Sequence, residues 1–238
     1  MALISHLVKE LALNTGTAEK SITVIARWLR EDGLLSQKGR GRGAAQATPL
    51  DAARLLIALM VGGKIKDAPQ AVRDFGQMVL IIPDTDGPEQ MISLEELFGL
   101  PDNHTFEEGI AALIGIWGNE DALRATMKIL VSLWGEDTNF SATIRTNDLG
   151  TWINVGDADF EYMLPTMAEL FTLDIGSAGL SDRLRAAFSS VLVRYEFGIG
   201  SVRTVDEMLL RSLGEVVADL RKPGSGIRDI VAEARSDG

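Results

Sequence analysis

The chain of 238 residues has no cysteine and only two histidines, His6 and His104. Without cysteine, a disulfide framework, a thiolate nucleophile and a thiolate metal site are all excluded. The two histidines lie far apart in the sequence, so a zinc site is not expected. We therefore expect no metal and no cofactor.

Long apolar runs and a secretory leader are also missing. No stretch approaches the roughly 20 apolar residues that a membrane-spanning helix needs. The N-terminus lacks a basic segment followed by an apolar block and a cleavage site. A cytoplasmic protein with no membrane partner is the expectation. With 46% apolar residues, the chain can bury the core of one large domain or of two ordinary ones.

Basic residues are scarce overall, but they concentrate near the N-terminus. The formal net charge is −11. Up to Asp74, however, 11 Lys and Arg face 7 Asp and Glu, a net charge of +4, which leaves −15 for the remainder. Salt screens charges beyond about 8–10 Å, so an acidic body held away from DNA costs little affinity. The charge distribution favours a DNA-contacting head on an acidic body.

The chain opens with the pattern of two helices joined by a tight turn. Apolar residues recur at three- and four-residue steps from Leu3 to Leu11, which predicts a helix ending near residues 14–16. Thr17 is expected to cap a second helix that closes at Gly33. The inward face of this second helix would comprise Ile22, Ile25, Ala26 and Leu29.

A third helix is expected after a polar, basic and glycine-rich stretch over residues 36–47. Thr48 supplies the N-cap of this helix, Pro49 its first position and Asp51 the acidic N3 residue. Paired glycines at 62 and 63 end it. Residues 36–47 would then form a ribbon between ordered elements.

The rest of the chain is predicted to mix helices with one small antiparallel sheet. Residues 121–134 are ambiguous, because their first half suits a helix and their second half equally suits a strand. The second half of residues 181–195 likewise suits either a helix or a strand. Thr105 with Glu108, and Thr204 with Glu207, are expected to cap helices. Helices are expected over 69–82, 93–98, 105–117, 181–195 and from 204, and strands over 140–146, 151–157 and 160–164. The predicted fold class is α+β, mostly helical.

The order of features from Leu11 to Leu35 is a helix, a turn at Gly16, a second helix and a Gly-Leu-Leu exit. This order resembles the winged helix-turn-helix superfamily, whose bacterial repressor members space the positioning helix, recognition helix and strand into the wing in this way. The resemblance covers residues 1–63 and implies binding of double-stranded DNA. The Gly-Arg stretch joined to the Thr48-Pro49 cap also resembles small prophage DNA-binding proteins, which suggests phage-type gene control.

The second helix presents a free face opposite its packed face. Lys20, Val24, Arg27 and Glu31 fall on that side of a 3.6-residue wheel. Because the first turns of a recognition helix enter the major groove, contacts are expected there. Glu31 would repel phosphate at the far end of the helix. The predicted contacts on this helix are Lys20, Ser21, Thr23, Val24 and Arg27.

The second DNA-binding signal is the run in which Lys38, Arg40 and Arg42 alternate with glycine. Glycine lets the backbone approach DNA, and arginine favours a narrow minor groove. The run is similar to the Arg-Gly-Arg core of AT-hook peptides, but the proline that follows the second arginine in those peptides is absent. We therefore interpret these three residues as DNA contacts from a wing.

Two patterns suggest enzymatic chemistry, and each has a simpler explanation. Residues 78–87 are similar to the strand and aspartate loop of haloacid dehalogenase-type phosphatases, which would make Asp84 the nucleophile; an acidic turn is the preferred interpretation. Asp157, Asp159 and Glu161 alternate and would offer oxygen ligands to magnesium or calcium. A charged edge strand explains them better. We predict no catalytic residue and no enzyme.

Turn-forming stretches at 83–90 and 223–226 suggest the domain boundaries. The predicted segments are a DNA-binding domain over 1–63, a helical connector over 64–90, an acidic interaction or oligomerisation domain over 91–222, and a tail over 223–238.

The expected function is sequence-specific transcription regulation by a homodimer, with a protein partner or effector at the acidic domain. Trp28, Leu209, Leu213 or Leu220 would supply the dimer contact. One alternative is a DNA-packaging or partition adaptor that forms a larger oligomer. The other is a metal-dependent DNA-processing enzyme that uses Asp84 and Asp86, or residues 157–161.

Overall fold

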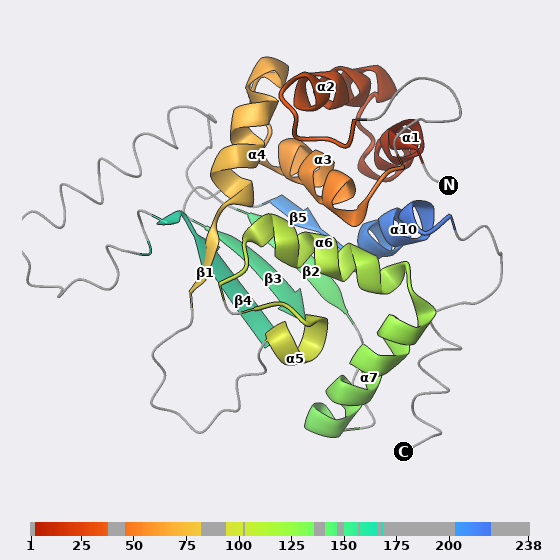
Figure 1. Cartoon of the computed structure of the whole chain (residues 1–238), viewed down its shortest axis with the longest axis vertical. Coiled ribbons are helices and arrows are strands. Elements are labelled where there is room, and N and C mark those ends of the chain that lie inside the picture. Colours follow the sequence, from red (N-terminus) through yellow and green to blue (C-terminus); the bar gives the residue numbers. More distant parts are fainter. Residues whose placement is uncertain are drawn as a thin grey trace, which may run out of the picture.

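The computed structural model describes residues 3–37, 46–81, 94–101, 103–135, 141–146, 150–156, 158–165, 168 and 203–219. Within these segments the fold is α+β and mostly helical, with one antiparallel sheet, as the sequence predicts. Figure 1 shows the sheet in the lower half of the molecule, with helices on one of its faces and a further helical layer above.

The first two helices match the predicted pair, apart from one cap. α1 (Ile4–Thr15) ends at Gly16, whose φ of 68° is left-handed. α2 (Glu19–Glu31) has Ala18 at its N-cap and no side-chain capping bond. The prediction that Thr17 caps this helix is wrong, because Thr17 lies one position too early in the chain. Its backbone N–H instead donates to Thr15 Oγ1 at 3.2 Å.

The third helix begins with the predicted capping box. In α3 (Pro49–Val61), Thr48 Oγ1 accepts from the Asp51 backbone N–H at 3.1 Å, and Asp51 Oδ2 accepts from the Thr48 N–H at 2.8 Å. A short 3-10 turn, η2 (Ile65–Asp67), follows and leads directly into the next helix.

The helix predicted over residues 69–82 is only half right. α4 (Ala68–Gly76) is helical, but Val79–Ile81 forms strand β1. This strand pairs antiparallel with residues 161–163, at least 80 positions later in the chain. Sheet pairing at that sequence distance overrides the local helical pattern.

The ambiguity over residues 121–134 is settled in favour of a helix. α5 (Leu94–Phe98) and α6 (Phe106–Trp117) lie as predicted, and α6 has the Thr105–Glu108 capping box. α7 (Glu120–Trp134) is then capped by Asn119, whose Oδ1 accepts from two backbone N–H groups at 3.1 and 3.2 Å. Three apolar side chains at helical spacing in α7 are buried: Leu123, Met127 and Leu130.

The predicted strands over residues 140–164 are confirmed. β2 (Ala142–Thr146), β3 (Thr151–Val155) and β4 (Ala158–Met163) join β1 and β5 (Arg203–Val205) in the order β1-β4-β3-β2-β5. In the register of the sheet, Ile144 lies opposite Ile153, and Ile153 lies opposite Phe160. This buried row faces the helices.

The prediction of a charged edge strand at Asp159 and Glu161 is wrong. β4 lies between β1 and β3, because β1 occupies the edge beyond it. Asp159 instead accepts hydrogen bonds from Asn154 Nδ2 at 2.6 Å and from Arg145 Nη2 at 3.4 Å. The third residue of this pattern, Asp157, lies outside the described residues.

The last described helix, α10 (Glu207–Val217), is capped by Asp206 and not by Thr204 as predicted. Asp206 Oδ1 accepts from the Leu209 backbone N–H at 3.1 Å. Thr204 belongs to β5, where it pairs with Arg145. The cap moves because strand pairing continues to Val205. The predicted helix over 181–195 lies outside the described residues.

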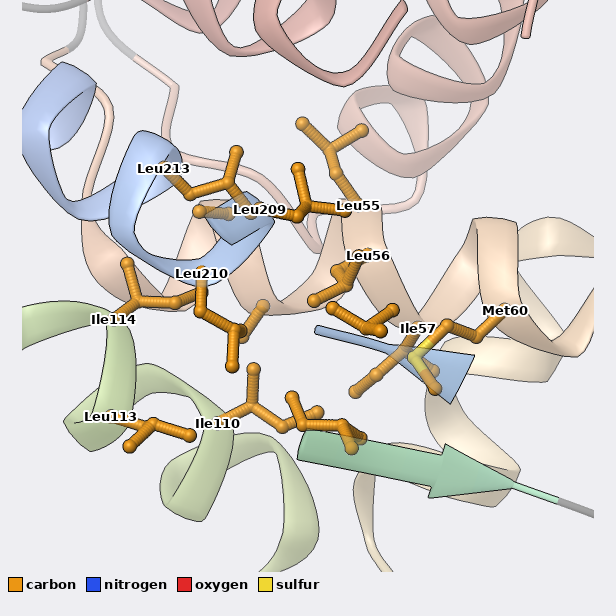
Figure 2. Packing of buried hydrophobic residues seen from close by; sticks show 14 of the residues in the cluster. Leu55, Leu56, Ile57, Met60, Ile110, Leu113, Ile114, Leu209, Leu210 and Leu213 are labelled. Atoms are coloured by element: carbon orange, nitrogen blue, oxygen red, sulfur yellow. The ribbon is translucent and has the colours of Figure 1, made fainter. Parts of the chain in front are cut away.

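Helix α10 returns to the start of the chain and packs against α1 and α6. Figure 2 shows side chains of α3, α6 and α10 pointing toward one another in the core. The prediction that Leu209 or Leu213 forms a dimer contact is wrong, because both are buried here. Leu220 lies outside the described residues. The first three helices and α10 therefore share one apolar core, and the division into segments stays a prediction.

Two glycines bring the backbones of α6 and α10 close together. A Cβ built on Gly214 would lie 2.5 Å from the Ile114 carbonyl oxygen and 2.7 Å from Trp117 Cβ. A Cβ on Gly118 would lie 2.7 Å from the Gly214 carbonyl oxygen. Such distances leave no room for a methyl group, so the contact requires glycine.

A buried hydrogen-bonded pair joins the start of α6 to β4. His104 Nδ1 lies 2.6 Å from the Pro101 carbonyl oxygen, and Nε2 lies 2.8 Å from the Tyr162 hydroxyl. A carbonyl only accepts, so Nδ1 carries a proton, and the tautomer with its second nitrogen unprotonated lets Nε2 accept from the Tyr162 hydroxyl. Burial raises the pKa of Tyr162 well above its ordinary value, which keeps the donor protonated.

We expect Tyr162→Phe to lower the free energy of unfolding by about 1–3 kcal/mol, because it leaves the buried His104 Nε2 without a donor. The ring and its packing against Phe106 are retained, so the loss reports the hydroxyl alone. Urea denaturation followed by circular dichroism would measure it. Unchanged stability would show that the hydroxyl contributes nothing.

Candidate nucleic-acid interface

Helix α2 lies at the top of the molecule, with α3 between it and the sheet (Figure 1). Its predicted inward face is confirmed, since Ile22, Ile25, Ala26 and Leu29 are all buried. These residues pack the helix against α1, α3, η2 and α4. Only one face of α2 is used for packing, and the opposite face is open to solvent.

The five residues predicted to contact DNA from α2 lie outside this packed face. Lys20, Thr23 and Arg27 are exposed, and Ser21 and Val24 are half-buried at its margins. The Thr23 hydroxyl donates to the Glu19 carbonyl oxygen at 2.8 Å, which leaves its oxygen free to accept. The surface presented along the helix is therefore polar apart from two apolar side chains, those of Val24 and of Trp28, which is 41% exposed.

Arg27 is held in place by a neighbour on the same helix. Its Nε donates to Glu31 Oε1 at 2.7 Å, and the two side chains are 74% and 47% exposed. This hydrogen bond raises the pKa of the Arg27 guanidinium. From the sequence, Glu31 is expected to repel phosphate. In the structure, its carboxylate also neutralises and orients Arg27 on the free face of α2.

The predicted wing residues Lys38, Arg40 and Arg42 lie outside the described residues. The chain is anchored on both sides of them. Leu35 is buried in the core, and Gln46 forms an isolated antiparallel bridge with Leu3.

A partly buried polar network holds the backbone just before this segment. Asp51 Oδ1 accepts from the Ser36 N–H at 2.7 Å, and Arg54 Nη1 donates to the Leu34 carbonyl oxygen at 2.8 Å. Arg54 also donates to both carboxylate oxygens of Glu107, at 2.9 and 2.8 Å. The hydrogen bond with Glu107 raises the pKa of Arg54. Residues 34–36 are thereby tied to α3 and α6.

The structure brings further cations beside α2, which the sequence pattern did not single out. Lys64 and Lys66 are exposed on the short segment that contains η2, and η2 packs against α2. Arg73 of α4 lies 2.5 Å from Asp32, just after α2. The only sequence signal for Lys64 and Lys66 was that these two lysines alternate directly after the glycine pair at 62 and 63.

Within the described part of the chain, no group of three acidic or histidine side chains converges as a metal site. Asp84 and Asp86 lie outside that part. The helices that the structure describes include none long and apolar enough to cross a membrane. Comparisons with known proteins find no relative, since no protein-family model, no curated protein and no solved structure matches this chain.

Proposed function

We propose that this protein binds double-stranded DNA sequence-specifically, with α2 as the recognition helix of a winged helix-turn-helix, and regulates transcription. The observation that carries the proposal is the open polar face of α2. Its exposed residues include Lys20, Thr23 and Arg27, on a helix that follows α1 after a tight turn. A helix that packs by one face alone can enter the major groove with the other.

Each residue of the free face suits a particular contact. Lys20, in the first turn of α2, suits a phosphate, and the hydroxyls of Ser21 and Thr23 suit base edges or phosphates. Val24 suits a thymine methyl group, and Arg27 suits guanine once it leaves Glu31.

Two further groups of cations extend the proposed site. Lys38, Arg40 and Arg42 would follow the minor groove beside the recognition helix. Lys64 and Lys66, on the segment that packs against α2, would contact phosphates flanking this helix. Each such phosphate contact releases counterions, so affinity should fall with increasing salt.

The acidic remainder of the chain is proposed to limit nonspecific binding and to provide a protein–protein contact. We place such a regulator in the cytoplasm, and the prophage resemblance suggests phage-type gene control. Neither a metal nor a cofactor enters this proposal.

Arg27→Ala is expected to weaken binding to the preferred duplex by about 1–3 kcal/mol if Arg27 reads a base. The preferred sequence would first be selected from random duplexes with the full-length protein. Fluorescence anisotropy at two salt concentrations would then compare the variants. Arg124→Ala is the matched control, because Arg124 also pairs with a glutamate four residues away, on α7.

Two results would count against this proposal. One is the absence of duplex binding by the wild-type protein near 0.1 M salt. The other is an equal effect of the Arg27 and Arg124 substitutions. Either would leave the open face of α2 without a role in DNA recognition.

Glu31→Gln is expected to strengthen binding to any duplex by about 0.5–1 kcal/mol, because it removes a charge opposed to phosphate and frees Arg27. The slope of log affinity against log salt should become steeper by about one. The same anisotropy titrations on a random-sequence duplex would detect both changes. An unchanged slope would mean that DNA does not approach this end of α2.

A further inference from the structure

Trp28 lies on the surface of α2 and not in the core. It is 41% exposed, whereas Trp117 on α6 is buried. Aromatic side chains of this size contribute strongly to binding when a ligand covers them, because one ring supplies a large apolar area. A single exposed apolar residue is common and by itself indicates nothing. The position of Trp28 on the helix therefore decides what it can do.

Trp28 follows Val24 by one helical turn, and residues four apart lie on the same side of a helix. At 100° per residue, Val24 lies about 30° from the middle of the free face of α2, and Trp28 about 70°. The middle is taken as the direction opposite the buried residues of this helix. Trp28 is thus at one flank of the face that we propose enters the major groove, and Val24 lies between it and the centre.

This flank of α2 borders the segment that carries Lys64 and Lys66. Asp32, one further turn along the same side, pairs with Arg73 of α4 at 2.5 Å. The short turn η2 leads directly into α4, and both pack against α2. Figure 1 shows α4 beside α2. Trp28 therefore lies on the side of the free face that faces these two exposed lysines.

The surroundings of Val24 and Trp28 suit the major groove of a duplex. The apolar feature of that groove is the C5 methyl group of thymine, and phosphates border it on both sides. The acidic residues nearest to Trp28 in the sequence, Glu31 and Asp32, each pair with an arginine. Two apolar side chains within this polar surface match methyl groups within a polar groove.

We propose that Val24 and Trp28 together select thymine, by packing against the methyl groups of two thymines in the major groove. This inference rests on the proposed function, since it names the bases that α2 prefers. Four residues of helix rise about 6 Å, and stacked base pairs are about 3.4 Å apart. The two thymines should therefore lie within about two base pairs of each other. Trp28 then contacts DNA and not a second copy of the chain.

Replacing thymine with deoxyuridine tests the inference, because it removes the methyl group and leaves base pairing unchanged. The full-length protein would be titrated by fluorescence anisotropy with its selected duplex and with duplexes that carry one deoxyuridine each. At two positions within about two base pairs of each other, the replacement should weaken binding about fourfold, the effect of one buried methyl group. Replacement of other thymines should change the affinity less.

Single substitutions assign each of these positions to a side chain. Val24→Ala should abolish the deoxyuridine effect at one position, and Trp28→Ala should abolish it at the other. Trp28→Phe keeps an apolar ring and should retain most of the effect. Leu133→Ala is the control, because Leu133 has a similar exposure of 40% but lies on α7. Circular dichroism would verify that each variant is folded.

Three results would overturn the inference and leave the proposed function standing. They are a selected sequence without such a pair of thymines, duplex binding with no deoxyuridine effect, and an effect that persists in Trp28→Ala. If Trp28→Ala instead lowers the mass of the free protein in sedimentation and leaves the deoxyuridine effect, Trp28 belongs to a protein contact and the inference is wrong. A wild-type protein that binds no duplex would refute the proposed function itself.

Discussion

Glu107→Ala is expected to lower the free energy of unfolding by about 3 kcal/mol, the lower end of the cost of breaking a buried ion pair, because it leaves the half-buried Arg54 without its carboxylate partner. The side chains of Glu107 and Arg54 are only 7% and 21% exposed. Glu107 also accepts from Gln77 Nε2 at 3.1 Å, so two donors lose their acceptor. Urea denaturation of the full-length protein would measure the change.

The surface pair on α7 provides the control for this prediction. Glu120→Ala removes a 58% exposed carboxylate from Arg124 and should cost less than about 1 kcal/mol. Replacing both Arg54 and Glu107 with apolar residues of similar size should cost less than Glu107→Ala alone. If the single and double changes cost the same, the penalty does not come from an unpaired buried charge.

Gly214→Ala is expected to destabilise the protein by about 3 kcal/mol, the upper end of the usual cost of overpacking. The new methyl group would lie 2.5 Å from the Ile114 carbonyl oxygen, and backbone cannot rotate away as a side chain can. α10 and α6 must then separate. Thermal and urea unfolding would both report the loss.

The same substitution at Gly115 should act in the opposite direction. A Cβ there has Pro49 Cγ at 3.9 Å as its nearest neighbour, which is ordinary contact. Alanine also favours the helix over glycine by up to about 1 kcal/mol. Gly115→Ala should therefore leave stability unchanged or raise it. Destabilisation by both changes to the same extent would mean that helix contact is not the cause.

Local chemistry predicted much of this fold. The capping boxes at Thr48 and Thr105 and the stop of α1 at Gly16 involve residues at most four positions apart. Apolar periodicity likewise predicted the buried face of α2. Such contacts form within one helical turn, so the sequence around them contains all the information needed.

The sequence-based predictions were wrong where pairing with a distant segment determines the local structure. Val79–Ile81 is a strand because β4 pairs with it, and β4 is internal for the same reason. The cap of α10 moves from Thr204 to Asp206 because β5 pairs with β2 through Val205. No local pattern reports a partner that is tens of residues away.

The candidate site divides in the same way. The exposed residues of α2 were predictable, because a helix that buries one face must expose the other. The placement of Lys64 and Lys66 beside α2 depends on how η2 packs, and the Glu107 anchor of Arg54 comes from α6. These parts of the interface depend on tertiary packing and could not be predicted from the sequence.

The sequence by itself determined which segments form α1, α2, α3 and α6 and which face of α2 is polar, because these depend on spacing within one or two turns. Only the tertiary structure decided that α10 returns to α1 and that one core joins the N-terminal helices to the sheet. Packing between distant segments is set by shape and apolar area summed over the whole chain, which no single stretch of sequence contains.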